Sequence, residues 1–158
     1  MKFSKTYITP IATGATNLQE SKDCVIRAIT NVTGVSYDEV HSFLAASGRK
    51  QGKGTDVESM TAACKHFGLK FIGTFGKTSS ARSCSYFGNR QYKYLHVTRN
   101  ESITLGKLIA SLPFGRFVVV IRGHAVAMID GKLIDTHHNP KQAQVVALFQ
   151  FGDLPDSV

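Results

Sequence analysis

The spacing of apolar positions divides the chain into a helical first half and a β-rich second half. Between residues 23 and 68 the apolar residues recur every three or four positions, which is the period of an amphipathic helix. Two capping-box patterns, Ser36–Glu39 and Thr55–Glu58, mark helix starts. We therefore predict three helices, the first of which begins with Ser21 or Asp23 as its N-cap. The predicted helices end at Gly34, Gly48 and Gly68.

The period changes after residue 68, where runs of β-branched and aromatic residues alternate with turn residues. Strands are predicted at 69–75, 94–98, 116–121, 125–129, 132–136 and 145–149, with a long loop at 76–93 and a short helix at 105–112. Helices that precede a mainly antiparallel sheet indicate an α+β fold. The 158 residues suffice for one domain, with its core at about 19–151 and an extended arm at 1–18.

The Asp130–Gly131 pair predicts a two-residue hairpin turn, which fixes the register of the strands on either side. Ile129 then lies opposite Lys132, and side chains alternate between the two faces of the sheet. In this register His124 and Asp135 share one face and lie diagonal to each other, within reach of a hydrogen bond. Their face is predicted to be that of an active site, and the other face to be buried in the core.

Cys24 falls in the first turn of the first predicted helix, a position that suits a nucleophilic cysteine. The helix dipole and the free first-turn amides favour a thiolate and can bind an oxyanion. A thiolate nucleophile needs an imidazole base, and the base needs an orienting group. We therefore expect a triad of Cys24, His124 and Asp135, with the sulfur within about 4 Å of a ring nitrogen. A slip of the hairpin register would substitute His137 or Asn139 for Asp135.

The order Gln19, Cys24, His124 and Asp135 resembles the papain-like cysteine peptidase superfamily. The spacing of Gln19 from the Asp-Cys pair especially resembles the bacteriocin-processing peptidase domains of peptide exporters. The resemblance implies a papain-like or transglutaminase-like fold and a cysteine-dependent hydrolase or acyl transferase that acts on a peptide or protein. It also implies that Gln19 donates a hydrogen bond to the oxyanion.

Several short segments are similar to a group of uncharacterised, phage-associated papain-like proteins. They are Asp23–Ala28, Gly48–Lys50, Thr104–Leu105, Gly115–Val119 and Gly123–Ala125. The similarity implies a role in the cytoplasm of an infected bacterium. The chain departs from papain itself, because it has no Gly-Ser-Cys-Trp segment, no tryptophan, and an aspartate where papain-type enzymes have asparagine.

The formal charge of +8 leaves a second hypothesis open. A basic protein attracts anionic partners, and residues 86–99 interleave aromatic and cationic side chains as single-stranded nucleic-acid binders do. An inactive papain-like fold that binds nucleic acid or a host protein is therefore the alternative function. No apolar run approaches the ~20 residues of a membrane helix, and the N-terminus has no signal-peptide core. We expect a cytoplasmic protein that makes no contact with a membrane.

The sequence also contains two further cysteines and a pair of adjacent histidines. Cys64 lies among apolar residues and is predicted to be buried, whereas Cys84 lies in a polar loop. The pair His137–His138 with His124 or Asp135 offers zinc ligands. Adjacent histidines on a strand point to opposite faces, so we expect neither a metal nor a cofactor.

Overall fold

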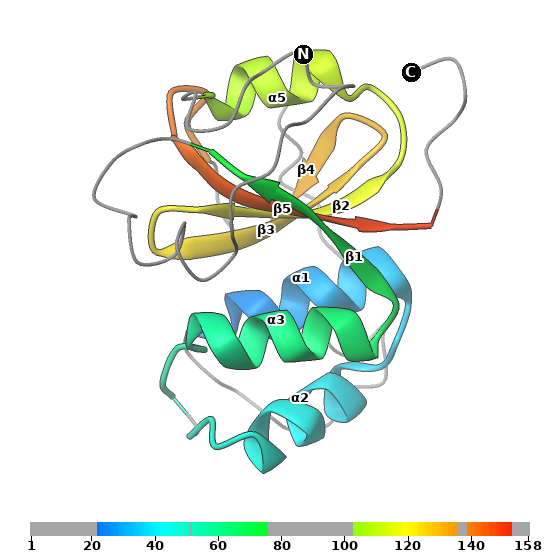
Figure 1. The fold of residues 1–158 in the computed structure, drawn as a ribbon, viewed down its shortest axis with the longest axis vertical. Helices are drawn as coiled ribbons and strands as arrows, with labels where there is room; N and C mark the ends of the chain where they lie inside the picture. The colour runs from blue at the N-terminus through cyan, green and yellow to red at the C-terminus, as the bar shows by residue number, and fades with distance from the viewer. Residues whose placement is uncertain (1–21, 51, 76–102, 136–138, 153–158) are drawn as a thin grey trace.

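The computed structural model describes residues 22–50, 52–75, 103–135 and 139–152. The described helices are α1 (Cys24–Thr33), α2 (Tyr37–Ala46), α3 (Val57–His66) and α5 (Leu105–Ser111). The strands are β1 (Leu69–Thr74), β2 (Arg116–Ile121), β3 (His124–Ile129), β4 (Lys132–Ile134) and β5 (Val145–Phe151). The three helices α1–α3 lie together on one side of the sheet, and α5 lies on the other (Figure 1). The α+β prediction is confirmed, whereas the predicted arm at 1–18, loop at 76–93 and strand at 94–98 lie outside the described residues.

The sheet has the strand order β1-β5-β2-β3-β4, and each of its neighbouring pairs is antiparallel. The predicted hairpin register is confirmed, with Ile129 opposite Lys132 and Ala127 opposite Ile134. Asp130–Gly131 supplies the turn, and both of its residues have a positive φ, 49° and 75°. A two-residue turn of this kind matches the twist of the flanking strands and thereby holds the register.

The helix starts follow from local hydrogen bonds between side chains and the first-turn amides. Ser36 accepts from the amide of Glu39 at 3.2 Å, which confirms the capping of α2. The predicted cap of α3 was wrong by one residue, because Asp56 and not Thr55 occupies the N-cap position. The carboxylate of Asp56 accepts from the amide of Ser59 at 2.7 Å, and a charged acceptor at this position also favours the helix dipole.

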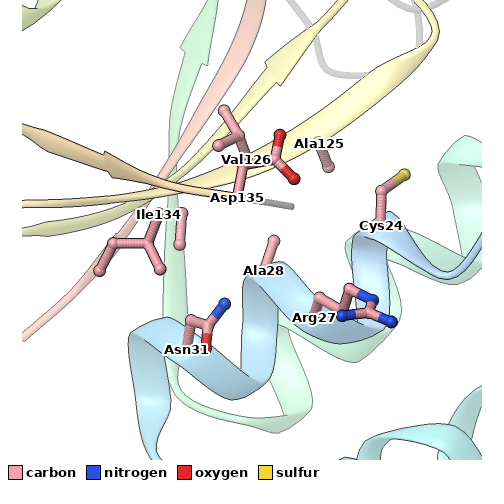
Figure 2. Close-up of a pocket in the computed structure, with 9 residues that line it drawn as sticks. Cys24, Arg27, Ala28, Asn31, Ala125, Val126, Ile134 and Asp135 are labelled. Carbon is pink, nitrogen blue, oxygen red and sulfur yellow. The ribbon is translucent and has the colours of Figure 1, made fainter. Parts of the chain in front are cut away.

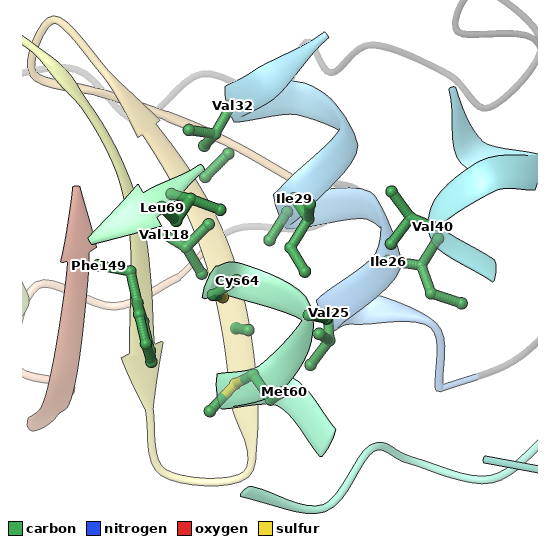
Figure 3. Close-up of a cluster of buried hydrophobic side chains, with 14 of the residues drawn as sticks. Val25, Ile26, Ile29, Val32, Val40, Met60, Cys64, Leu69, Val118 and Phe149 are labelled. Carbon is green, nitrogen blue, oxygen red and sulfur yellow. The ribbon is translucent and has the colours of Figure 1, made fainter. Parts of the chain in front are cut away.

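Two apolar cores lie on opposite faces of the sheet. The first joins α1, α2 and α3 to the sheet, and Figure 3 shows Ile29 and Val25 of α1 beside Cys64 and Val118. The prediction that Cys64 belongs to the core is confirmed, since its side chain is fully buried. The second core packs α5 against the other face, and it includes Leu105, Leu108, Phe117, Val119, Val126, Met128, Leu133 and Leu148.

Candidate active site

Cys24 is the first residue of α1. The ring of His124 and the backbone groups of Ala125 and Val25 lie close enough to its sulfur to lower the pKa of the thiol. The helix places the sulfur there because α1 packs on β3, whose first residues lie near the start of the helix. Backbone and imidazole donors that converge on one sulfur stabilise its thiolate form.

His124 is the first residue of β3 and follows Gly123, whose φ of 71° belongs to the turn from β2. Its Nε2 lies 2.6 Å from Oδ2 of Asp135. Since Nε2 faces the carboxylate, Nδ1 is the ring nitrogen left to bond the sulfur of Cys24. The structure therefore brings the three side chains together in the order expected of a nucleophile, its base and the orienter of that base.

The side of the sheet on which this site lies differs from the prediction. The face that His124 shares with Val126 and Met128 was expected to line an active site, but both of the latter are buried in the core beneath α5. Cys24 packs on the opposite face, near Ala125. The contact between His124 and Asp135 forms at the ends of two strands. His124 begins β3, and Asp135 follows the last residue of β4. A terminal side chain can reach round the end of a sheet, so strict alternation does not apply to it.

Asp135 is held in turn by Asn139. Oδ2 of Asp135 accepts from Nδ2 of Asn139 at 2.8 Å, and both residues are buried, at 8% and 3% exposure. Asn139, which the sequence left as an alternative orienter, thus fixes the carboxylate that contacts His124. The other alternative, His137, lies outside the described residues.

The ionisation of the site favours a thiolate beside an imidazolium. Burial by itself raises the pKa of Cys24, but the hydrogen bond and charge of His124, with the backbone groups of Ala125 and Val25, lower the pKa below its usual value. Burial by itself lowers the pKa of His124, but Asp135 and Cys24 raise that pKa to about 9. The pKa of Cys64 is raised by burial alone. The two described cysteines are therefore shifted in opposite directions.

A buried polar cluster beside Cys24 was missed by sequence reasoning. Asp23, the N-cap of α1, makes no side-chain cap; its carboxylate accepts from Nε of Arg27 at 2.9 Å and from the hydroxyl of Tyr37 at 2.8 Å. The Asp–Arg spacing of four residues on one helix face was a readable signal for the first contact. No pattern in the sequence signals the contact between Asp23 and Tyr37, because that contact depends on how α2 packs against α1.

A small hollow separates α1 from the β3–β4 hairpin next to the site. Figure 2 shows Cys24, Arg27 and Asn31 on the helix and Asp135 on the hairpin around it. Its volume is about 10 Å³, which is near the space of one water molecule. This hollow is too small for a peptide.

Several predicted features lie outside the described residues. They are Gln19, Cys84, His137, His138 and residues 86–99. Within the ranges that the structure describes, no group of three or more His, Cys, Asp and Glu side chains is placed to hold a metal ion. The described helices include none with the length and apolar content that crossing a membrane requires.

Comparison with known proteins leaves the site to be judged on its geometry. No protein-family model, no curated protein and no solved structure matches this chain.

Proposed function

We propose that the protein is a cysteine-dependent hydrolase or acyl transferase with a papain-like fold, and that its reaction is the cleavage of a peptide or isopeptide bond. One observation carries this proposal: Cys24 at the start of α1 lies beside His124, which lowers the pKa of the thiol, and Nε2 of His124 lies 2.6 Å from Oδ2 of Asp135. A buried structural cysteine has no need of such partners, as Cys64 illustrates. Helices packed on an antiparallel sheet, with the cysteine on the first described helix, support the papain-like fold.

The proposed reaction begins with attack of the Cys24 thiolate on the carbonyl carbon of the substrate. The tetrahedral intermediate collapses when the C–N bond breaks, and the His124 imidazolium gives its proton to the departing amine. A thioester remains on Cys24. The neutral imidazole then takes a proton from water, whose oxygen attacks the thioester and releases the acid. An amine in place of that water would give acyl transfer by the same steps.

The position of Cys24 at the start of α1 supports the proposal that its backbone amide stabilises the oxyanion. The amide of Cys24 lies at the positive end of the helix dipole, where a developing negative charge is favoured. The Asp23 side chain does not occupy the first-turn amides, because Arg27 and Tyr37 hold it elsewhere. Asp135 raises the pKa of His124 and so supports the imidazolium form of the ring through the first step.

Alkylation by iodoacetamide over a range of pH tests the activated thiol. A lowered pKa means that the Cys24 thiolate persists as the pH falls, so Cys24 should react at a lower pH than a free cysteine does. Cys64 should stay unreactive in the folded protein, because burial raises its pKa and blocks access. Peptide mapping by mass spectrometry identifies which cysteine carries the label.

The same labelling in denaturant is the matched control. All three cysteines should then react together, with a midpoint at about pH 8.5, the value of a free cysteine. A Cys24 that titrates alike in the folded and denatured chains would contradict the proposed activation.

Asp135→Asn is expected to lower kcat/KM by about 10- to 100-fold, because the amide can still accept from the ring but no longer carries a charge. The carboxylate raises the pKa of His124 to about 9. Its removal should lower that pKa, so the imidazolium is lost sooner and the alkaline limb of the pH–rate profile moves to lower pH. Asn139→Ala keeps the charge and should shift that limb less. Equal profiles for wild type and Asp135→Asn would exclude the orienting role.

A further inference from the structure

The loop between α2 and α3, residues 47–56, lies next to the start of α1. Nη2 of Arg49 donates to the carbonyl oxygen of Lys22 at 3.4 Å, and Lys22 is two residues before Cys24. The loop holds this position through backbone bonds of its own, from Arg49 to the carbonyl of Leu44 at 2.9 Å and from Lys53 to Lys50 at 3.0 Å. Figure 1 shows the starts of α1 and α3 at the same end of the helical layer. The Arg49 contact therefore brings one end of this loop to the border of the nucleophile, and Lys50 and Lys53 follow Arg49 in the chain.

The four cations of this border form what we term the basic rim: Lys22, Arg49, Lys50 and Lys53. All three lysines are solvent-exposed, and Arg49 is half-buried. The four cations of the rim outnumber the nearby carboxylates, which are the buried Asp23 and the exposed Asp56 and Glu58 at the start of α3. Asp23 is 7% exposed and already accepts from Arg27 and Tyr37, and Asp56 caps α3. A substrate bound to Cys24 would consequently meet a positive surface on this side.

We propose that the basic rim selects substrates with acidic side chains next to the bond that Cys24 attacks. This inference rests on the proposed function and specifies the class of its substrate. Exposed charges within about 10 Å of a bound chain act on it at 0.1 M salt, and charges at a rim mainly change the rate of association and its salt dependence. An acidic peptide would gain association rate, and a basic peptide would be repelled.

Three chloroacetyl peptides test the inference, identical except for a run of aspartate, serine or lysine residues behind a shared glycine spacer. Each alkylates a thiolate, forming a sulfur–carbon bond and releasing chloride, and the rate constant kinact/KI is measured at Cys24 by mass spectrometry. At low ionic strength the aspartate probe should react about 10-fold faster than the serine probe, and the lysine probe more slowly. The difference should shrink to about 2-fold in ~0.5 M salt.

The variant Lys50→Glu/Lys53→Glu should remove the preference. The readout is the ratio of the aspartate to the serine rate, so a general loss of reactivity cancels. Lys70→Glu/Lys107→Glu is the matched control, because it changes the net charge equally at two exposed lysines on β1 and α5. The control should keep the wild-type ratio.

Equal rates with the aspartate and serine probes in the wild type would overturn the inference and leave the nucleophile intact. If the control variant Lys70→Glu/Lys107→Glu also loses the ratio of the aspartate to the serine rate, the preference comes from net charge and the inference is overturned. If an oligothymidylate slows the labelling of Cys24 and the three peptides react at equal rates, the rim is a nucleic-acid surface. That result would also overturn the inference. If none of the probes labels Cys24, the proposed function fails together with the inference.

Discussion

His124→Ala is expected to lower the kcat/KM for hydrolysis of a p-nitrophenyl ester by about 10³- to 10⁴-fold, equivalent to about 4–5.5 kcal/mol. The ring of His124 is both a hydrogen-bond partner of the Cys24 sulfur and the neighbour of Asp135. Its loss removes the base that activates water for hydrolysis of the thioester and two of the influences that lower the pKa of the thiol. The rate of ester hydrolysis and the pH dependence of iodoacetamide labelling should therefore change together.

His66→Ala is the matched control for this variant, because His66 is an exposed histidine in the last turn of α3. It should retain wild-type hydrolysis. Circular dichroism and thermal unfolding establish whether each variant is folded. A folded His124→Ala protein with wild-type turnover would refute the catalytic role of His124, whereas a folded wild type without turnover would refute the enzyme hypothesis and favour the basic binding module.

Ile29→Ala is expected to lower the free energy of unfolding by about 2–5 kcal/mol, a large part of the 5–15 kcal/mol typical of a domain. Ile29 lies on α1, is fully buried and belongs to the core between the helices and the sheet. Truncation loses the transfer free energy of the side chain and leaves a cavity that close-packed neighbours cannot fill. Since α1 also carries Cys24, the loss of packing should disturb the site.

Urea unfolding measures this effect as a fall in the midpoint with little change in slope. Lys65→Ala on the exposed side of α3 is the control and should stay within about 0.5 kcal/mol of the wild type. A loss below about 1 kcal/mol for Ile29→Ala would contradict the packing of α1 on the sheet.

Most of the fold could be predicted from the sequence because its elements depend on short-range rules. The helical period predicted α1, α2 and α3, and β2 was predicted with its observed bounds, Arg116–Ile121. The displaced cap of α3 shows where such rules become imprecise. Thr55 and Asp56 are adjacent residues that both suit an N-cap, and Asp56 occupies that position in the structure.

The sequence by itself determined the hairpin register, which brings the chain at Asp135 near His124, because a two-residue turn leaves one pairing of the strands. Only the tertiary structure decided which end and face of the sheet Cys24 meets, that Asn139 fixes Asp135, and that Tyr37 reaches Asp23. The physical reason is the range of each interaction. Turn geometry and alternation act between neighbours in the chain, whereas these contacts depend on the packing of helices against a twisted sheet.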